Sequence, residues 1–78
     1  MKTKYKYIEF ILCKRLPKTK VYNCFPKGKD WAIGTIKWYP PWRQYCFFPE
    51  GDTVFNNTCQ NDIAEFLTNL NLEHKNKK

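Results

Sequence analysis

The stretch that decides the fold is IGTIKWYPPWRQYCFFP, residues Ile33–Pro49. It contains two runs rich in aromatic and β-branched residues, Gly34–Tyr39 and Arg43–Phe48, a composition typical of strands. Pro40 and Pro41 lack the N–H group that a sheet ladder needs, so they mark a turn between the two runs. The stretch therefore predicts a β-hairpin.

An even-numbered hairpin loop places three pairs opposite each other on one face, because side chains alternate along a strand. These pairs are Trp38 with Arg43, Ile36 with Tyr45 and Gly34 with Phe47. Large apolar side chains then occur on both faces of the hairpin. Either both faces are covered, or one presents aromatic and polar groups to a partner.

Outward from the hairpin, alternating apolar residues predict strands over Lys4–Leu12 and Lys20–Phe25, and they extend the first hairpin strand back to Trp31. After these strands the apolar period becomes helical. The residues that share this helical face are Cys59, Ile63, Phe66, Leu67 and Leu70. A helix is expected over Thr58–Leu70, with Asn57 as its N-cap and Gln60 reaching back to it.

The sequence thus predicts an α+β fold, an antiparallel sheet of three to four strands with one C-terminal helix packed on one face. Residues 1–72 form the single domain, and residues 73–78 form a disordered basic tail. If the turn before the hairpin has an even number of residues, the residues on the helix side are Val21, Phe25, Ala32, Gly34, Ile36 and Phe47. The small residues Ala32 and Gly34 then let the helix approach closely. The opposite face carries Tyr22, Cys24, Trp31, Ile33, Thr35, Lys37, Gln44, Cys46 and Phe48. A register shift of one residue exchanges the two sets.

The formal net charge of +7 is unevenly distributed. Residues 1–19 hold six basic residues and one acidic residue, residues 20–72 hold five of each, and residues 73–78 hold three basic residues and one acidic residue. A basic chain favours a polyanionic partner, and the neutral centre weakens that inference.

Four cysteines are present, Cys13, Cys24, Cys46 and Cys59, without a CxxC motif. We expect reduced, mostly buried thiols, with two disulfides or a metal site as alternatives. No apolar run approaches the roughly 20 residues that span a bilayer, and the N-terminus lacks the apolar core of a signal peptide. We therefore expect a cytoplasmic protein, monomeric or homodimeric, that does not bind membranes.

No catalytic constellation is evident, because the acidic residues are scattered and the single histidine, His74, lies in the expected tail. We expect no enzymatic activity, no cofactor and no metal.

Two surfaces are candidates for binding. The face opposite the helix combines aromatic rings with hydrogen-bonding groups, the mixture that stacks on bases and contacts their edges. The residues expected to contact nucleic acid are Trp31, Thr35, Lys37 and Gln44 on the sheet, with Arg43, Lys4 and Lys6 on phosphates. The alternative is that the N-terminal segment folds over this face.

The second candidate surface is the Pro-Pro turn with its flanking aromatic residues Trp38, Tyr39 and Trp42. Tryptophan dominates many protein–protein interfaces, so these residues could anchor a partner protein. The alternative is that the two tryptophans clamp the prolines and cap the core.

The runs IKWYPPWRQYCFFP and TVFNNTCQNDIAEFL resemble short proteins of bacterial phages and mobile elements, which implies such an origin. The layout is also loosely similar to AP2-type and integrase arm-type domains, which read DNA with the sheet face away from the helix. Their motifs are absent here, and the neutral centre departs from their basic sheets. The resulting prediction is a small non-enzymatic accessory module that contacts nucleic acid. The alternative is an inhibitor or regulator that binds a host enzyme or defence protein.

Overall fold

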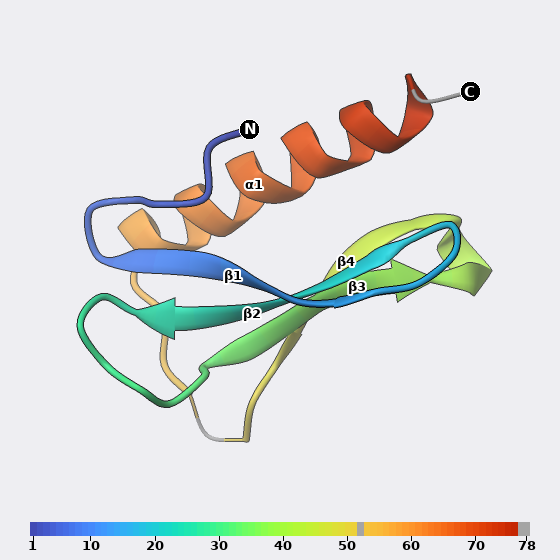
Figure 1. Cartoon of the computed structure of the whole chain (residues 1–78). Coiled ribbons are helices and arrows are strands. Elements are labelled where there is room, and N and C mark those ends of the chain that lie inside the picture. The colour runs from blue at the N-terminus through green and yellow to red at the C-terminus, as the bar shows by residue number, and fades with distance from the viewer. Residues whose placement is uncertain (52, 77–78) are drawn as a thin grey trace.

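The computed structural model describes residues 1–51 and 53–76 and has the expected α+β architecture. One antiparallel sheet with the order β1-β2-β3-β4 carries a single long helix, α1, on one face (Figure 1). The elements are β1 Ile8–Arg15, β2 Lys20–Pro26, β3 Gly34–Tyr39, the short 3-10 helix η1 Pro40–Trp42, β4 Gln44–Pro49 and α1 Asn57–Lys75.

The β3–β4 hairpin forms, but its register differs by two residues from the expected one. Its pairs include Trp38 with Tyr45, Ile36 with Phe47 and Gly34 with Pro49. The reason is the turn: η1 is followed by Arg43 in the left-handed conformation (φ 53°), and the Arg43 N–H donates to the Pro40 carbonyl at 3.1 Å. The loop therefore occupies Pro40–Arg43. A shift of two residues preserves the faces, so Gly34, Ile36 and Phe47 do lie on the helix side.

The expected faces of β2 are wrong. Tyr22 pairs with Ile36 and Cys24 pairs with Gly34, so Tyr22 and Cys24 share the helix side, where both are buried. Val21 and Phe25 consequently belong to the opposite side. An odd number of residues, 25–33, separates Cys24 from its partner, and the Ile33 N–H donates to the Cys24 carbonyl at 2.7 Å before β3 begins.

The start of β3 was also predicted too early, because Trp31, Ala32 and Ile33 precede the strand. Ile33 packs against the core instead of lying on the opposite face. The close approach at Gly34 is made by the Phe47 ring, which a Cβ atom at this position would overlap, and not by the helix.

The core lies between the sheet and α1, where the expected helical face is confirmed. Ile63, Phe66 and Leu70 are buried, and Cys59 and Leu67 pack against them. The Phe66 ring stacks on Phe10 with centroids 4.0 Å apart. Such aromatic burial supplies much of the apolar area that a small domain needs.

Both ends of α1 differ from the prediction. Asn56, not Asn57, is the N-cap, and its side chain accepts from the Cys59 N–H at 2.9 Å. Gln60 donates to the Phe55 carbonyl at 3.3 Å. The helix continues through Lys75, so the disordered tail expected from Glu73 onward is wrong for these residues, whereas 77–78 lie outside the described part of the chain.

The N-terminal residues do not extend β1 as predicted. The Tyr5 N–H donates to the Ile8 carbonyl and the Phe10 N–H donates to the Thr3 carbonyl, so the chain turns back before Ile8. The segment lies beside α1 (Figure 1), and its Tyr5 ring is buried against Phe10 with centroids 5.8 Å apart. It therefore packs on the helix side and leaves the opposite face of the sheet uncovered.

Candidate nucleic-acid interface

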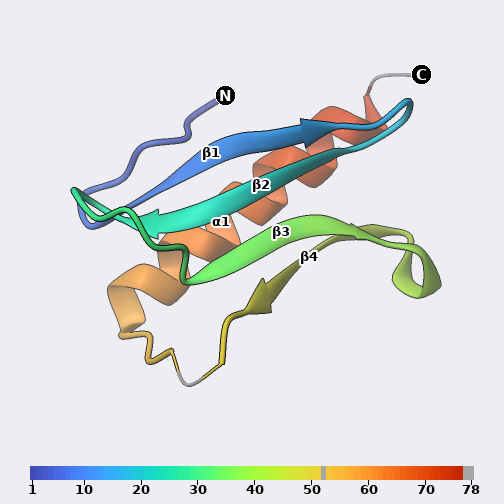
Figure 2. The same ribbon diagram turned by 60° about the horizontal axis from the view of Figure 1, so that its bottom comes forward.

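We call the sheet surface turned away from α1 the outer face. Figure 2 shows the sheet in front of α1, and no segment within 1–51 or 53–76 crosses this surface. Strand alternation and register place on it Glu9, Ile11, Val21, Asn23, Phe25, Thr35, Lys37, Tyr39, Gln44, Cys46 and Phe48. Three expected residues, Thr35, Lys37 and Gln44, are among them.

Three rings form an aromatic row on the outer face, defined as Phe48, Tyr39 and Trp42. The Tyr39 and Trp42 centroids lie 5.2 Å apart at 88°, and the Tyr39 and Phe48 centroids lie 6.0 Å apart at 64°. Trp42, at the end of η1, is 67% exposed. The Lys37 ammonium lies over the Phe48 ring, 4.8 Å from its centroid. The row therefore joins the accessible indole of Trp42 to the ammonium of the exposed Lys37.

Polar groups flank this row. Gln44 is exposed and pairs with Tyr39 across the hairpin. The Thr35 hydroxyl donates to the Asn23 side-chain oxygen at 3.4 Å. Thr35 is thus already engaged within the sheet, whereas Gln44 and Lys37 present their ends to solvent.

Basic residues occur at one end of the molecule, where the β1–β2 turn, the β3–β4 turn and the last turn of α1 all lie (Figure 1). We call this the basic end; its basic residues are Lys14, Arg15, Lys18, Lys20, Arg43 and Lys75. Glu73 is the acidic residue among these segments, and it pairs with Lys20 at 3.6 Å. The sequence alone did not reveal this grouping, because the residues come from three separate segments.

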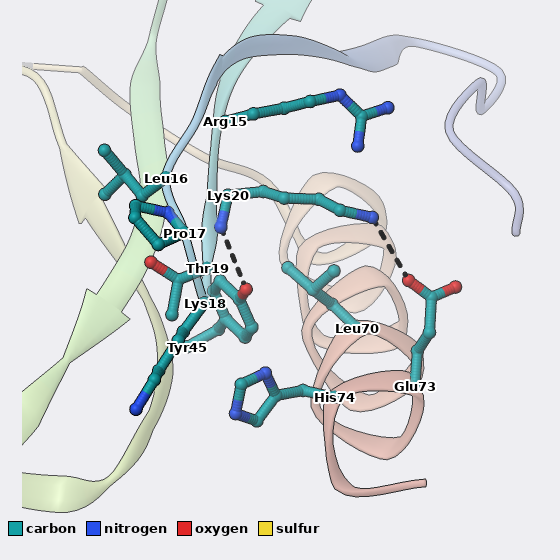
Figure 3. A pocket seen from close by; sticks show the side chains of 10 residues that line it. All are labelled: Arg15, Leu16, Pro17, Lys18, Thr19, Lys20, Tyr45, Leu70, Glu73 and His74. Carbon is teal, nitrogen blue, oxygen red and sulfur yellow. Dashed lines mark hydrogen bonds and ion pairs between the residues drawn. The ribbon is translucent and has the colours of Figure 1, made fainter. Parts of the chain in front are cut away.

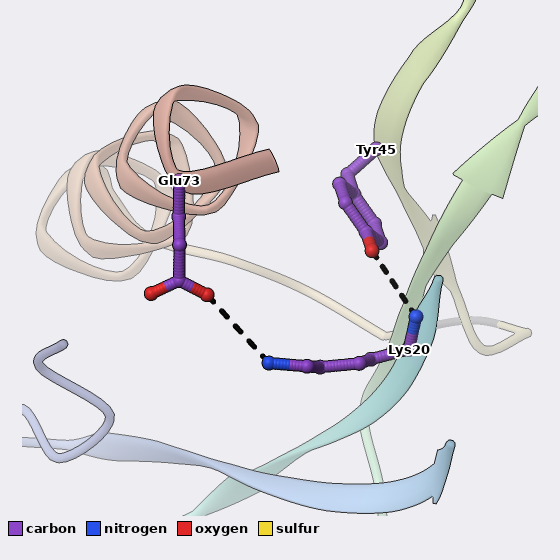
Figure 4. Close-up of polar contacts among 3 residues, drawn as sticks. All are labelled: Lys20, Tyr45 and Glu73. Carbon is purple, nitrogen blue, oxygen red and sulfur yellow. Dashed lines mark hydrogen bonds and ion pairs between the residues drawn. The ribbon is translucent and has the colours of Figure 1, made fainter. Parts of the chain in front are cut away.

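A cavity of about 420 Å³ opens at the basic end. Figure 3 shows its lining: Arg15, Leu16, Pro17, Lys18, Thr19, Lys20, Tyr45, Leu70, Glu73 and His74. The Lys20 backbone N–H donates to the Tyr45 hydroxyl at 3.1 Å while the Lys20 ammonium reaches Glu73 (Figure 4). Burial raises the pKa of Tyr45, whereas the hydrogen bond from the Lys20 N–H acts in the opposite direction. The hydrogen bond joins the start of β2 to β4, and the ion pair joins it to α1.

Several expected site residues lie elsewhere. Trp31, predicted on the sheet face, lies in the β2–β3 connection, 55% exposed, with the Lys29 ammonium 5.4 Å from its ring centroid. Lys4 and Lys6 belong to the N-terminal segment beside α1. Arg43 lies at the basic end.

The three residues of the expected partner-binding tip are divided between the two faces. Trp38 lies on the helix side, where its ring centroid is 5.4 Å from that of Tyr45 and 4.6 Å from that of His74. Tyr39 and Trp42 remain together on the outer face. The tip therefore presents one exposed tryptophan and not two.

The cysteines do not form a common site. All four are free; Cys13 is exposed, Cys24 is buried, and Cys46 and Cys59 are half-buried. Burial raises the pKa of Cys24 to about 12, with the Cys59 thiol as a second cause. Over the described ranges, no three His, Cys, Asp or Glu side chains gather as metal ligands would. Nor does any helix there have the length and apolarity to cross a membrane.

Comparisons with known proteins place the chain among phage proteins. It is 32% identical over 71 residues to an uncharacterized 9.3 kDa protein of Acholeplasma phage L2, and the match covers 88% of this chain and 90% of that protein. No protein-family model matches, and no solved structure matches. At this identity and coverage, the chain belongs to the same family as the 9.3 kDa protein of Acholeplasma phage L2.

Proposed function

We propose that the protein is a small non-enzymatic phage or mobile-element accessory module that binds nucleic acid in the cytoplasm. The observation that carries this proposal is the position of the outer face directly beside the basic end. Stacking rings and phosphate-binding cations are the two components of nucleic-acid affinity that tolerate any sequence. Here Trp42 of the aromatic row and Arg43 of the basic end are consecutive residues of the same turn.

The proposed roles follow from position. Tyr39, Trp42 and Phe48 contact bases, and Lys37 and Gln44 provide hydrogen bonds beside them. The phosphate contacts come from the basic end, with Arg43 next to Trp42 and Arg15 and Lys18 in and beside the β1–β2 turn.

The test is binding to single- and double-stranded DNA and RNA at increasing salt concentration. Affinity falls as the salt concentration rises, and each lost phosphate contact makes the slope of log affinity against log salt less steep by about 1. The double variant Lys18→Gln with Arg43→Gln should therefore make the slope less steep by about 2 and weaken binding to all sequences.

The matched control is Lys4→Gln with Lys6→Gln, which removes the same charge from the N-terminal segment beside α1. We expect this pair to leave the slope nearly unchanged. Absence of binding at low salt would exclude the proposal. An equal loss in both double variants would show that net charge, and not the basic end, is responsible.

Docking to a host enzyme or defence protein is the second candidate, and the exposure of Trp42 on a proline-rich turn favours it. Tryptophan and tyrosine are enriched among the residues that dominate protein–protein binding energy. Capture of one defined host protein by the wild type and not by Trp42→Ala, without nucleic-acid binding, would favour this function over the first.

A further inference from the structure

We infer that the outer face binds single-stranded nucleic acid and not a duplex, an inference that rests on the proposed function. The ligand is a single strand of DNA or RNA whose bases stack on the aromatic row and whose phosphates reach the basic end. Four observations carry it: the width of the sheet, the apolar composition of its outer face, the course of the row and the position of Lys37.

The width of the sheet argues against entry into a duplex groove. Four strands spaced about 4.8 Å apart make a layer about 14 Å wide before side chains are added. The major groove of B-DNA is about 12 Å wide and admits a helix or a two-stranded ribbon. The outer face could therefore rest on an undistorted B-DNA duplex but could not place its central side chains against base edges.

The composition of the outer face favours a ligand that offers flat apolar surfaces. Besides the aromatic row, it carries Ile11, Val21 and Phe25, and Ile11 is 48% exposed. A duplex presents charged phosphates on its outside and keeps its base planes stacked inside. An unpaired strand exposes those planes, so it can cover aromatic rings and gain stacking energy.

The aromatic row also has a direction. It runs from Phe48 through Tyr39 to Trp42, and the next residue, Arg43, belongs to the basic end. A strand that follows the rings is thereby led to the cations that hold its phosphates. Positive charges at one end of a stacking surface attract the phosphates of the strand and so give it a preferred path.

Lys37 is placed to change partners when a base arrives. Its ammonium lies 4.8 Å from the centroid of the Phe48 ring, and its side chain is exposed. A base that stacks on Phe48 takes the place of this ammonium, which can then turn to the adjacent phosphate. The same lysine thus protects an apolar ring in the free protein and neutralises charge in the complex.

The experiment measures fluorescence anisotropy with labelled single strands of DNA and of RNA about 12 nucleotides long, and with the matching duplexes, at one salt concentration. We expect single strands to bind at least about tenfold more tightly than duplexes, because each stacked base contributes substantially. Tyr39→Ala and Trp42→Ala should each weaken single-strand binding about tenfold while leaving the salt slope unchanged.

Trp31→Ala is the matched control, because it removes another exposed tryptophan, 55% exposed against 67% for Trp42, from the β2–β3 connection. It should bind like the wild type, and Trp42→Phe should keep most of the affinity. Circular dichroism confirms that each variant is folded. Two results would overturn the inference: equal affinity for duplex and single strand, or full affinity in the folded variants Tyr39→Ala and Trp42→Ala. The proposed function would stay in place in either case if the double variant Lys18→Gln with Arg43→Gln still weakens binding. Absence of all binding overturns both.

Discussion

Trp38 and Trp42 lie four residues apart in the chain and reach opposite sides of the sheet. Trp38 packs against Tyr45 and His74 on the helix side, whereas Trp42 contacts Tyr39 on the outer face. Strand alternation separates Trp38 from Tyr39, and the left-handed backbone of Arg43 completes a turn that holds Trp42 near Tyr39. Composition identified both tryptophans as notable, but only the turn conformation decides which one can meet a ligand.

The N-cap of α1 provides a prediction at this scale, because two adjacent asparagines compete for the role. Asn56 has extended backbone and accepts from the Cys59 N–H, whereas Asn57 is already the first helical residue. Asn56→Ala should lower the free energy of unfolding by about 1 kcal/mol. Asn57→Ala should leave it nearly unchanged, since alanine is favourable within a helix. Urea denaturation measures both, and an equal loss in the two variants would contradict the assignment of the cap.

At the scale of elements, α1 does more than cover the sheet, because it also occupies the free edge of β4 at Tyr45. The Tyr45 N–H donates to the Asn71 side-chain oxygen at 2.7 Å, and the Asn71 amide donates to the Tyr45 carbonyl at 3.4 Å. The asparagine thus satisfies the two edge groups that a neighbouring strand would pair. Pro49, at the end of β4, has no N–H to offer, so this edge is protected against pairing with other chains.

Removal of this contact should destabilise the domain. Asn71→Ala leaves the Tyr45 N–H without its partner, and its expected cost is about 1 kcal/mol in the free energy of unfolding. Asn61→Ala is the control, because Asn61 is exposed on the same helix and gains the same helix propensity. Urea denaturation of both variants gives the difference. If Asn71→Ala is as stable as Asn61→Ala, the side chain does not hold the edge.

Elements with a regular period could be predicted from sequence, and elements set by tertiary contacts could not. The apolar period of residues 59–70 was sufficient to identify α1 and its buried face. Its last turn escaped prediction, since His74 is held by Trp38 and Glu73 by Lys20, residues distant in the chain. The face of β2 was assigned wrongly because it depends on whether the loop before β3 has an odd or even length, and local composition does not encode this number.

At the scale of the whole molecule, the separation of charge is a product of topology. The basic end combines the β1–β2 turn, the β3–β4 turn and the last turn of α1, while Asp30, Glu50, Asp62 and Glu65 lie in other parts of the chain. A count along the sequence gives a neutral centre, because it adds charges that the fold keeps apart. Thr35, Lys37 and Gln44 could be placed on one face from strand alternation alone, whereas the neighbouring cations required the tertiary structure.

Stability of the whole domain should fall at alkaline pH. Burial raises the pKa of the Cys24 thiol to about 12, and burial with the nearby Glu65 carboxylate raises the pKa of the Tyr5 phenol to about 12. In the unfolded chain the pKa of the cysteine thiol is about 8.5 and that of the tyrosine phenol is about 10. The folded state therefore keeps two protons that the unfolded state releases. The resulting stability is complete below about pH 8.5 and is lost as the pH rises toward 12.

Urea denaturation in the presence of a reductant, at a series of pH values above neutrality, measures this dependence. Between the unfolded and folded pKa values, each group should lower the free energy of unfolding by about 1.4 kcal/mol per pH unit. Cys24→Ala leaves a cavity and lowers the stability at every pH, but it also removes one of the two proton-linked groups. Its stability should therefore decline less steeply than that of the wild type above about pH 9. An identical slope in the two proteins would mean that the Cys24 thiol ionises in the folded state as readily as in the unfolded chain, and that the core is open to water at this position.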